Sequence, residues 1–311
     1  MPEKAARQAR TLLTRFHRQR PLRAGSLLVT IFGDAIAPRG AAATLGSLIR
    51  LAEPFGLTER LVRTSVARLA QDDWLSPRRD GRLSEYRLSA TGERRFSEAT
   101  RRIYGVTPTA WDGRWTLLLM PPQLGRPTEK VRDELTWLGF GQLAPGVFAH
   151  PTRSRDEATE CVRSLGGAAA AFVMLDSATG NVDADRSLAR AGWDLADLET
   201  RYRRFVRAFG PALDAVATGA PSPRDAFVLR TLLIHEYRRI HLRDPLLPAV
   251  LLPDRWIGGE AYELTRSIYA GVFDPAETFL ATTGATLDGP LPQPESAVRR
   301  RFGGLLESAG Q

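Results

Sequence analysis

The sequence predicts a multidomain α+β protein with an N-terminal winged helix-turn-helix, a small central ferredoxin-like (Cas2-like) domain and a mainly helical C-terminal domain. Three observations support this. Residues 1–105 hold 20 basic and 10 acidic side chains, whereas the rest of the 311 residues hold 23 and 25. Three helix patterns and a hairpin follow one another within residues 26–104. Strand and helix patterns then alternate, and helices alone continue to the end.

The composition shifts place the domain boundaries. We expect a basic arm at residues 1–24, the winged helix-turn-helix at residues 25–104, a linker at residues 105–113, the ferredoxin-like domain at residues 114–185 and the helical domain at residues 186–311. The arm carries six arginines and little apolar periodicity, which is compatible with a partly helical binding segment or with a solvated tail.

The first two helices are bounded by capping and breaking residues. Ser26 precedes an apolar run that ends near Gly33 and Pro38, and a second apolar pattern covers residues 44–52 before Pro54. Serine caps a helix N-terminus because its hydroxyl accepts from an unpaired amide, and proline interrupts the helix. These signals predict two short helices joined by a turn.

A third helix, at residues 59–72 after the capping residue Thr58, has two distinct faces. Leu61, Val62, Ser65, Val66 and Leu69 share one arc. The opposite arc carries Arg60, Arg63, Thr64, Ala67, Arg68 and Gln71. Arginines separated by small residues fit the major groove of DNA, where guanidinium groups bind guanine and short side chains allow close approach. A solvated basic face is the alternative.

A cationic hairpin follows. Residues 74–78 predict a strand, residues 79–82 a tight turn and residues 83–88 the returning strand, before Ser89 caps a helix that reaches about residue 104. Arg78, Arg79 and Arg82 lie at the hairpin tip, where they could reach phosphates as a wing does. This order of elements predicts a winged helix-turn-helix that binds double-stranded DNA.

The composition indicates where in the cell the protein is expected. No apolar stretch approaches the roughly 20 residues of a membrane span, and the start has no apolar signal region. The single cysteine, Cys161, excludes an intrachain disulfide and is expected to be a buried apolar residue. We therefore expect a cytoplasmic protein without membrane association.

Strand patterns at residues 115–120, 146–150 and 168–175 alternate with helix patterns at residues 127–138 and 154–165, which predicts the ferredoxin-like domain. Helices are expected at residues 195–209, 222–243 and 259–272. Residues 139–144 formally match a dinucleotide fingerprint, but they follow a helix and do not open one, so no cofactor is expected.

Over nearly its whole length the sequence resembles the PaaX family, the repressors of phenylacetic acid degradation. The matching stretches are Phe32-Gly33-Asp34, Leu45-Gly46-Ser47-Leu48, Arg60-x-Val62-Arg63-Thr64, Arg68-Leu69, Trp111-Asp112-Gly113-x-Trp115, Gly139-Phe140-Gly141-x-Leu143-Ala144-Pro145, His235-x-Tyr237-Arg238-Arg239, Asp244-Pro245-Leu246-Leu247-Pro248, Trp256-x-Gly258 and Arg301-Phe302-Gly303-Gly304-Leu305. The chain departs from the family pattern in its arginine-rich start and at His241.

The resemblance implies a homodimeric transcriptional repressor of an aromatic (phenylacetate) catabolic operon, released from its operator by an aryl-acetyl coenzyme A thioester such as phenylacetyl-CoA. The C-terminal domain would bind this effector and hold the dimer. It also implies a central domain with the fold of small CRISPR-associated nucleases, which does not imply nuclease activity.

Two groups of residues are candidates for the effector site. His235, Arg238 and Arg239 could bind phosphates or a carboxylate, because guanidinium groups suit both. The alternative is a helix paired with Glu236 and Asp244. Aromatic residues could line an aryl pocket or could simply pack in the core; they are Trp256, Tyr262 and Tyr269.

A hydrolase is the second hypothesis, either a nuclease on the central domain or a metal enzyme using His235 and His241. Zinc-binding histidines on one helix face are four residues apart, whereas six residues turn the helix by ~600° and separate these two. No carboxylate cluster or nucleophile motif accompanies them. We therefore expect neither a catalytic residue nor a metal site.

Overall fold

The computed structural model describes residues 2–19, 24–105, 110–121, 127–165 and 172–305, and the chain divides into two compact units. Unit 1 comprises Met1–Val106, Arg204–Arg239 and Glu260–Gln311, and unit 2 comprises Thr107–Arg203 and Ile240–Gly259. This grouping cuts across the linear division expected from the sequence, because most of the C-terminal segment belongs to the same unit as the N-terminal third.

The N-terminal part of unit 1 contains the predicted helices and hairpin in the predicted order, together with a regular helix at the start of the chain and a short additional strand. In chain order, its elements are α1 (Pro2–His17), α2 (Ala24–Ile31), β1 (Ala42–Thr44), α3 (Leu45–Ala52), α4 (Glu59–Gln71), β2 (Leu75–Asp80), β3 (Leu83–Leu88) and α5 (Ala90–Tyr104). A π-helical turn (Phe32–Ile36) and a 3-10 turn (Ala37–Arg39) extend α2, and a 3-10 turn (Glu53–Phe55) follows α3. Capping by Thr44, Thr58 and Ser89 begins α3, α4 and α5.

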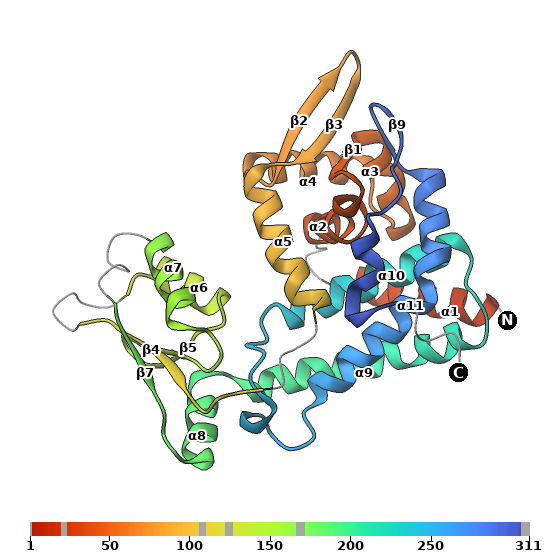
Figure 1. The fold of residues 1–311 in the computed structure, drawn as a ribbon. Helices are drawn as coiled ribbons and strands as arrows, with labels where there is room; N and C mark the ends of the chain where they lie inside the picture. The colour runs from red at the N-terminus through yellow and green to blue at the C-terminus, as the bar shows by residue number, and fades with distance from the viewer. Residues whose placement is uncertain (1, 20–23, 106–109, 122–126, 166–171, 306–311) are drawn as a thin grey trace. The chain divides into compact units, whose positions relative to one another are not determined.

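The three strands form an antiparallel sheet in the order β1-β3-β2. β1 pairs Ala42 with Arg87 and Thr44 with Glu85. This strand was not predicted, because three residues rich in alanine lack the alternation and β-branching that indicate a strand. The β2–β3 hairpin projects beyond the helices of its unit (Figure 1).

A close contact between α5 and the turn after α2 explains the glycine at position 33. A Cβ on Gly33 would lie 2.7 Å from Cε1 of the Phe96 ring, a separation that real Cβ atoms essentially never show. Phe96 itself is buried and meets Trp74 edge to face. Gly33 therefore allows α5 to pack directly against the turn after α2.

The start of the chain is more ordered than the basic arm expected from its composition. Residues 2–17 form the regular helix α1, and four apolar residues spaced for one helix face are buried: Ala5, Ala9, Leu12 and Phe16. Two of these are alanines, whose small apolar area gives a weak periodic signal among the arginines. Residues 1 and 20–23 of the predicted arm lie outside the described residues.

Two of the three C-terminal helices are longer than predicted. The three are α9 (Leu195–Ala217), α10 (Pro223–His241) and α11 (Ile257–Thr283), followed by the strand pair β8 (Ala285–Thr286) and β9 (Gly289–Pro290) and a 3-10 segment (Ser296–Gly303). Helix α10 ends two residues before the predicted residue 243. The ends expected at residues 209 and 272 are wrong, because α9 and α11 continue through Pro211 and Pro275. Burial of Ala212, Ala276 and Leu280 beyond the prolines offsets the lost hydrogen bonds.

Unit 2 contains the central sheet. Its elements are β4 (Trp115–Leu119), α6 (Glu129–Trp137), β5 (Gly141–Ala144), β6 (Val147–His150), α7 (Arg155–Leu165), β7 (Val173–Ser177), α8 (Val182–Gly192) and a 3-10 turn (Ala249–Leu251). All strand pairs are antiparallel, in the order β5-β6-β4-β7. This is the order expected for the ferredoxin-like topology, with α6 and α7 as the two crossovers.

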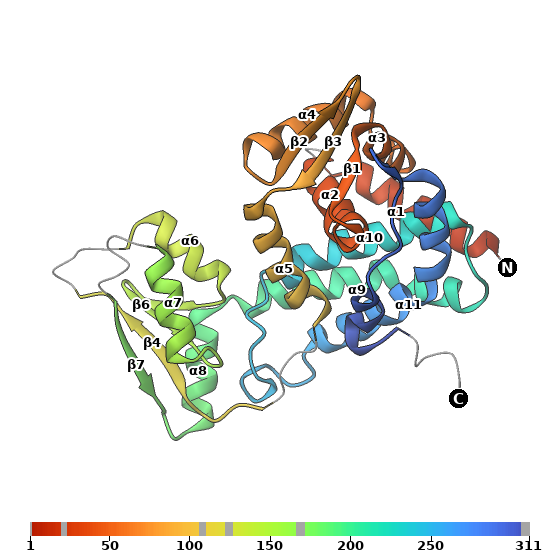
Figure 2. The same cartoon turned by 45° about the horizontal axis from the view of Figure 1, so that its top comes forward.

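The two faces of the central sheet have separate cores. Leu118 and Phe148 point to the face covered by α6 and α7, whereas Trp115 and Ala149 point to the face that packs with Ala189 of α8 (Figure 2). Strand β5 was not predicted, and part of the strand expected at residues 168–175 lies outside the described residues, as does the side chain of Cys161. No helix in the described ranges is long and apolar enough to cross a membrane.

Candidate DNA-binding surface

Helix α4 presents the cationic face that the sequence predicted. Val62 and Val66 are buried, while the side chains on the opposite arc are exposed: Arg60, Arg63, Thr64, Ala67, Arg68 and Gln71. The hydroxyl of Thr58 accepts from the amide of Leu61 at 3.3 Å and begins the helix there. The first turn and the cationic arc of α4 are thus exposed on the surface of unit 1.

Arg63 has a neighbour on its own helix. Its Nε lies 2.8 Å and its Nη2 2.7 Å from Oε1 of Glu59, one turn earlier, and both side chains are more than half exposed. An exposed pair of this kind contributes little to stability. Arg63 can therefore exchange Glu59 for a base edge or a phosphate at low cost.

The hairpin tip gathers a second set of cations. Asp80 pairs with Leu83, so Gly81 and Arg82 form a two-residue turn, and Gly81 has the φ of +54° that such turns favour in glycine. Arg78, Arg79 and Arg82 are all exposed. The structure places them together at one end of β2 and β3, as the sequence predicted.

A buried carboxylate links this hairpin to the C-terminal segment. Glu85 on β3 is fully buried, and its Oε1 accepts from the amide of Leu287, in the turn between β8 and β9, at 2.8 Å. Its Oε2 lies 4.0 Å from Arg78 and 3.9 Å from Arg87. Sequence patterning missed this contact, because a glutamate on a short amphipathic strand carries no sign of a partner 202 residues away.

A second link holds α3 to the same segment. The hydroxyl of Ser47 donates to the carbonyl of Ala285 at 3.0 Å and accepts from its amide at 2.7 Å. Nε of Arg50 donates to the carbonyl of Thr283 at 3.1 Å. The region that carries the cationic face is therefore hydrogen-bonded to the C-terminal hairpin through both α3 and β3.

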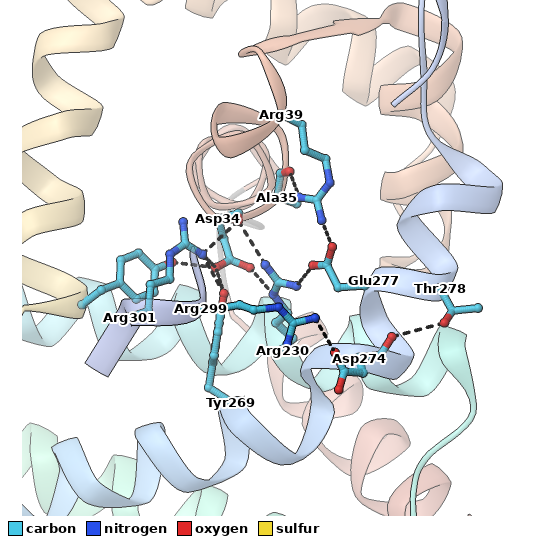
Figure 3. A network of polar contacts seen from close by, with 11 residues as sticks. Asp34, Ala35, Arg39, Arg230, Tyr269, Asp274, Glu277, Thr278, Arg299 and Arg301 are labelled. Atoms are coloured by element: carbon cyan, nitrogen blue, oxygen red, sulfur yellow. Dashed lines mark hydrogen bonds and ion pairs between the residues drawn. The ribbon is translucent and has the colours of Figure 1, made fainter. Parts of the chain in front are cut away.

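A buried polar network centres on Asp34, in the π-helical turn after α2 (Figure 3). Its Oδ1 accepts from the hydroxyls of Tyr104 at 2.7 Å and Tyr269 at 2.9 Å and from Nη1 of Arg301 at 2.8 Å. Its Oδ2 accepts from Nε of Arg230 at 2.6 Å. Helices α5, α10 and α11 and the C-terminal 3-10 segment thus converge on one carboxylate.

Glu277 of α11 extends the network. It accepts from Nη1 of Arg230 at 2.5 Å and from Arg39, which also donates to the carbonyl of Ala35 (Figure 3). Burial and, after it, the nearby charge of Arg230 lower the pKa of Arg39 to about 10. Three guanidinium groups and two carboxylates therefore share one interior region, where each charge depends on its neighbours.

The charges of the network also set the pKa of its centre. Burial raises the pKa of the Asp34 carboxyl, but Arg230, Arg301 and the hydrogen bond from Tyr104 lower it by more, so it lies below its usual 3.8. Burial and the charge of Asp34 raise the pKa of Tyr104 and of Tyr269. Asp34 is thus ionised and both hydroxyls are protonated donors at neutral pH.

The cationic effector candidates on α10 contact the N-terminal helices. Nδ1 of His235 lies 3.1 Å from the Thr30 hydroxyl, and Arg238 donates to Thr30 at 2.8 Å and to the Ser26 carbonyl at 2.7 Å. Burial lowers the pKa of Arg238 to about 10. Arg239 lies 3.2 Å from both Glu236 and Gln19. Arg238 and Arg239 therefore have protein partners in this structure, and the Glu236 pairing is the one expected under the alternative.

The aromatic candidates contact other residues than the candidates on α10 do. Tyr269 belongs to the Asp34 network, Tyr262 packs edge to face with Phe302, and Trp256 packs with Tyr202 in unit 2. Asp244, which lies beyond the end of α10, accepts from the Tyr202 hydroxyl at 2.8 Å. Unit 1 contains both the α10 candidates and Tyr269, but these residues contact different side chains.

The two histidines of the metal hypothesis have separate neighbours as well. His235 lies beside Thr30, and Nδ1 of His241 lies 3.0 Å from the Tyr202 hydroxyl. Within the part of the chain that the structure describes, no group of three or more histidine, cysteine, aspartate or glutamate side chains could hold a metal ion.

Comparison with known proteins matches three consecutive segments of the chain to one family. Residues 23–92 match the PaaX-like protein family, residues 108–189 the PaaX protein central Cas2-like domain, and residues 193–282 the PaaX-like protein C-terminal domain. The chain is 37% identical over 291 residues to the transcriptional repressor PaaX of Escherichia coli strain K12, covering 92% of each sequence. It also matches the structure of the uncharacterized protein Rv0674 from Mycobacterium tuberculosis, with 25% identity, a TM-score of 0.47 and coverage of 75% of this chain and 89% of that one.

These matches define a multidomain helix-and-sheet protein with a Cas2-like central domain between two family-specific domains. The chain belongs to the PaaX-like family. The similarity to a transcriptional repressor supports the repressor interpretation of the sequence and gives no support to the hydrolase alternative.

Proposed function

We propose that this protein is a DNA-binding transcriptional repressor whose residues 25–104 act as a winged helix-turn-helix. Helix α4 is the recognition helix, with Arg60, Arg63, Thr64 and Arg68 at base edges and phosphates. The β2–β3 hairpin is the wing. The observation that carries the proposal is an exposed cationic arc on α4 and a cationic hairpin tip in the same unit, in a chain similar to a transcriptional repressor.

The regulated genes and the signal form the second part of the proposal. The repressor controls an aromatic (phenylacetate) catabolic operon, acts in the cytoplasm as a homodimer on a two-fold symmetric operator, and leaves it when an aryl-acetyl-CoA such as phenylacetyl-CoA binds. In this proposal the functional regions are those expected from the sequence, with residues 105–113 as linker, residues 114–185 as the central domain and residues 186–311 for effector and dimer contacts, although residues 204–239 and 260–311 belong to unit 1. The candidates on the effector side are His235, Arg238, Arg239, Trp256 and Tyr269.

Release of DNA by a thioester tests this function. The protein is used to select its operator from a library of random duplexes, and the complex is then titrated with phenylacetyl-CoA, free coenzyme A and phenylacetate in separate experiments. We expect release by the thioester and none at equal concentrations of the two fragments. Failure to enrich any sequence would contradict the repressor proposal, and enrichment without release would contradict the effector alone.

The wing makes a separate prediction. Arg79→Ala should weaken binding to operator and random duplexes alike and reduce the slope of log affinity against log salt by about one unit, because one phosphate contact is lost. Arg203→Ala, which removes an exposed arginine paired with Glu199, is the control and should leave the slope unchanged. An unchanged slope for Arg79→Ala would exclude Arg79 from phosphate binding.

A further inference from the structure

The exposed side of α1 carries a stripe of cations. At 100° per residue, six side chains fall within about 100° of arc: Lys4, Arg7, Thr11, Thr14, Arg15 and Arg18, with Arg10 at the margin. All seven are exposed. The stripe runs for ~21 Å along the helix axis, and Thr11, Thr14, Arg15 and Arg18 line a shallow, open hollow on it.

Four arginines of the later helices have an ion-pair partner on their own helix. In each case the acidic residue lies three or four positions earlier: Arg163–Glu160, Arg201–Asp197, Arg203–Glu199 and Arg266–Glu263. Residues 2–18 contain five lysines and arginines and only one acid, Glu3. No described residue forms an ion pair with any of the five. In this respect α1 resembles Arg60, Arg68, Arg79 and Arg82 of the proposed DNA-binding surface.

The stripe is held in place by the opposite side of the helix. Ala5, Ala9, Leu12 and Phe16 are buried, and the Phe16 ring packs edge to face on His235 with centroids 5.7 Å apart. Nε2 of His17 lies 2.8 Å from the carbonyl of Phe55, in the turn between α3 and α4. The C-terminal end of α1 is thus attached to the helix-turn-helix itself, and its cations have fixed positions relative to α4.

We propose that the exposed face of α1 is a second DNA-binding surface, which binds the phosphate backbone without reading sequence. The proposal rests on the proposed function, since it extends the footprint of the same protein. Unpaired cations over ~21 Å match a polyanion with a phosphate every 3.4 Å per strand. A membrane surface fits less well, because the apolar side of α1 is buried in the protein and cannot enter a bilayer.

Binding to a 40-base-pair duplex of random sequence tests this surface without knowledge of the operator. The triple variant Arg7→Gln, Arg15→Gln and Arg18→Gln removes three charges but keeps good helix formers and the buried face of α1. We expect the slope of log affinity against log salt to fall by about two to three units and the affinity at ~100 mM salt to fall ~10- to 100-fold. Circular dichroism should be unchanged.

Two matched variants distinguish a direct contact between α1 and DNA from an effect of the protein's net charge. Replacing Arg163, Arg201 and Arg203 with glutamine removes the same charge elsewhere and should leave the slope within a few tenths of the wild-type value. Replacing Arg7, Arg15 and Arg18 with lysine keeps the charge and should retain the slope. If the glutamine variant of α1 binds like the wild type, or if the control loses as much, α1 is not a DNA-binding surface.

The outcomes also distinguish this proposal from the proposed function. A wild-type slope in the α1 variant, together with weakened operator binding by an α4 variant, would overturn the α1 surface and leave the repressor intact. No binding of the wild-type protein to random duplex at low salt would contradict both. Binding of the wild-type protein to anionic vesicles that the glutamine variant loses, with DNA binding unaffected, would assign the stripe to a membrane and overturn this proposal.

Discussion

Asp34→Asn is expected to lower the free energy of unfolding by about 3–5 kcal/mol, the largest effect of any single polar substitution considered for this protein. The amide would turn a donor toward Arg230 or the Tyr104 hydroxyl, where a carboxylate oxygen now accepts. Arg230 and Arg301 would lose their shared charge partner while remaining buried. Urea unfolding followed by circular dichroism measures the change.

A matched control lies close to the network. Asp274→Asn removes a carboxylate that is 75% exposed and 3.5 Å from Arg299 (Figure 3), and it should cost less than about 1 kcal/mol because exposed pairs contribute little. An Asp34→Asn variant as stable as Asp274→Asn would show that the network does not stabilise the fold.

The effect of Asp34 should depend on pH in a defined direction. Because its pKa in the folded protein lies below the usual 3.8, the folded state favours the ionised carboxyl. The stability it contributes is complete above pH ~4 and is lost as the pH falls through 3.8 toward the lower folded value. The difference in unfolding free energy between the wild type and Asp34→Asn should shrink over that interval. A constant difference would mean that the charge of Asp34 is not the stabilising feature.

Arg63→Ala is expected to lower operator affinity by about 1–3 kcal/mol, or ~5- to 150-fold, and to relax sequence preference. Arg63 lies at the centre of the exposed arc of α4, and its present partner Glu59 is exposed and easily replaced. Competition between the operator and single-base variants of it, followed by fluorescence anisotropy, measures both effects.

Arg201→Ala is the control for Arg63, since Arg201 is also an arginine paired with an acid one turn earlier. It should leave operator affinity within about twofold of the wild type. If Arg63→Ala bound the operator as tightly as the wild type does, α4 would not be the helix that reads the bases. Loss of affinity with unchanged sequence preference would reassign Arg63 to a phosphate contact.

Local signals predicted most of the DNA-binding candidate. Thr58 begins α4, Val62 and Val66 face the interior, and Gly81 turns the hairpin, as the sequence indicated. Each signal depends on residues within one or two turns of one another, so the chain displays it before folding. Helical periodicity placed Arg63, and the turn signal of the hairpin placed Arg79, on positions that are exposed in the structure.

Helix ends depended on more than local preference. Two helices were expected to end at residues 209 and 272, yet both continue through Pro211 and Pro275, and apolar residues beyond the prolines are buried. The α1 helix was predicted only as a basic arm for a related reason. Its alanine-rich side stabilises the helix only when it is buried against neighbouring residues. Burial against distant segments is not visible in a local pattern.

The partners of the buried charged residues could not be predicted from local sequence patterns. The order of helices and hairpin, the two faces of α4 and the cationic tip follow from spacing and charge along a short stretch of chain. The convergence of Asp34, Arg230 and Arg301 on one site, and of Glu85 on Leu287, joins residues about 200 or more positions apart. A buried charge is tolerated only where the folded chain supplies its partners, so only the tertiary structure could identify these residues.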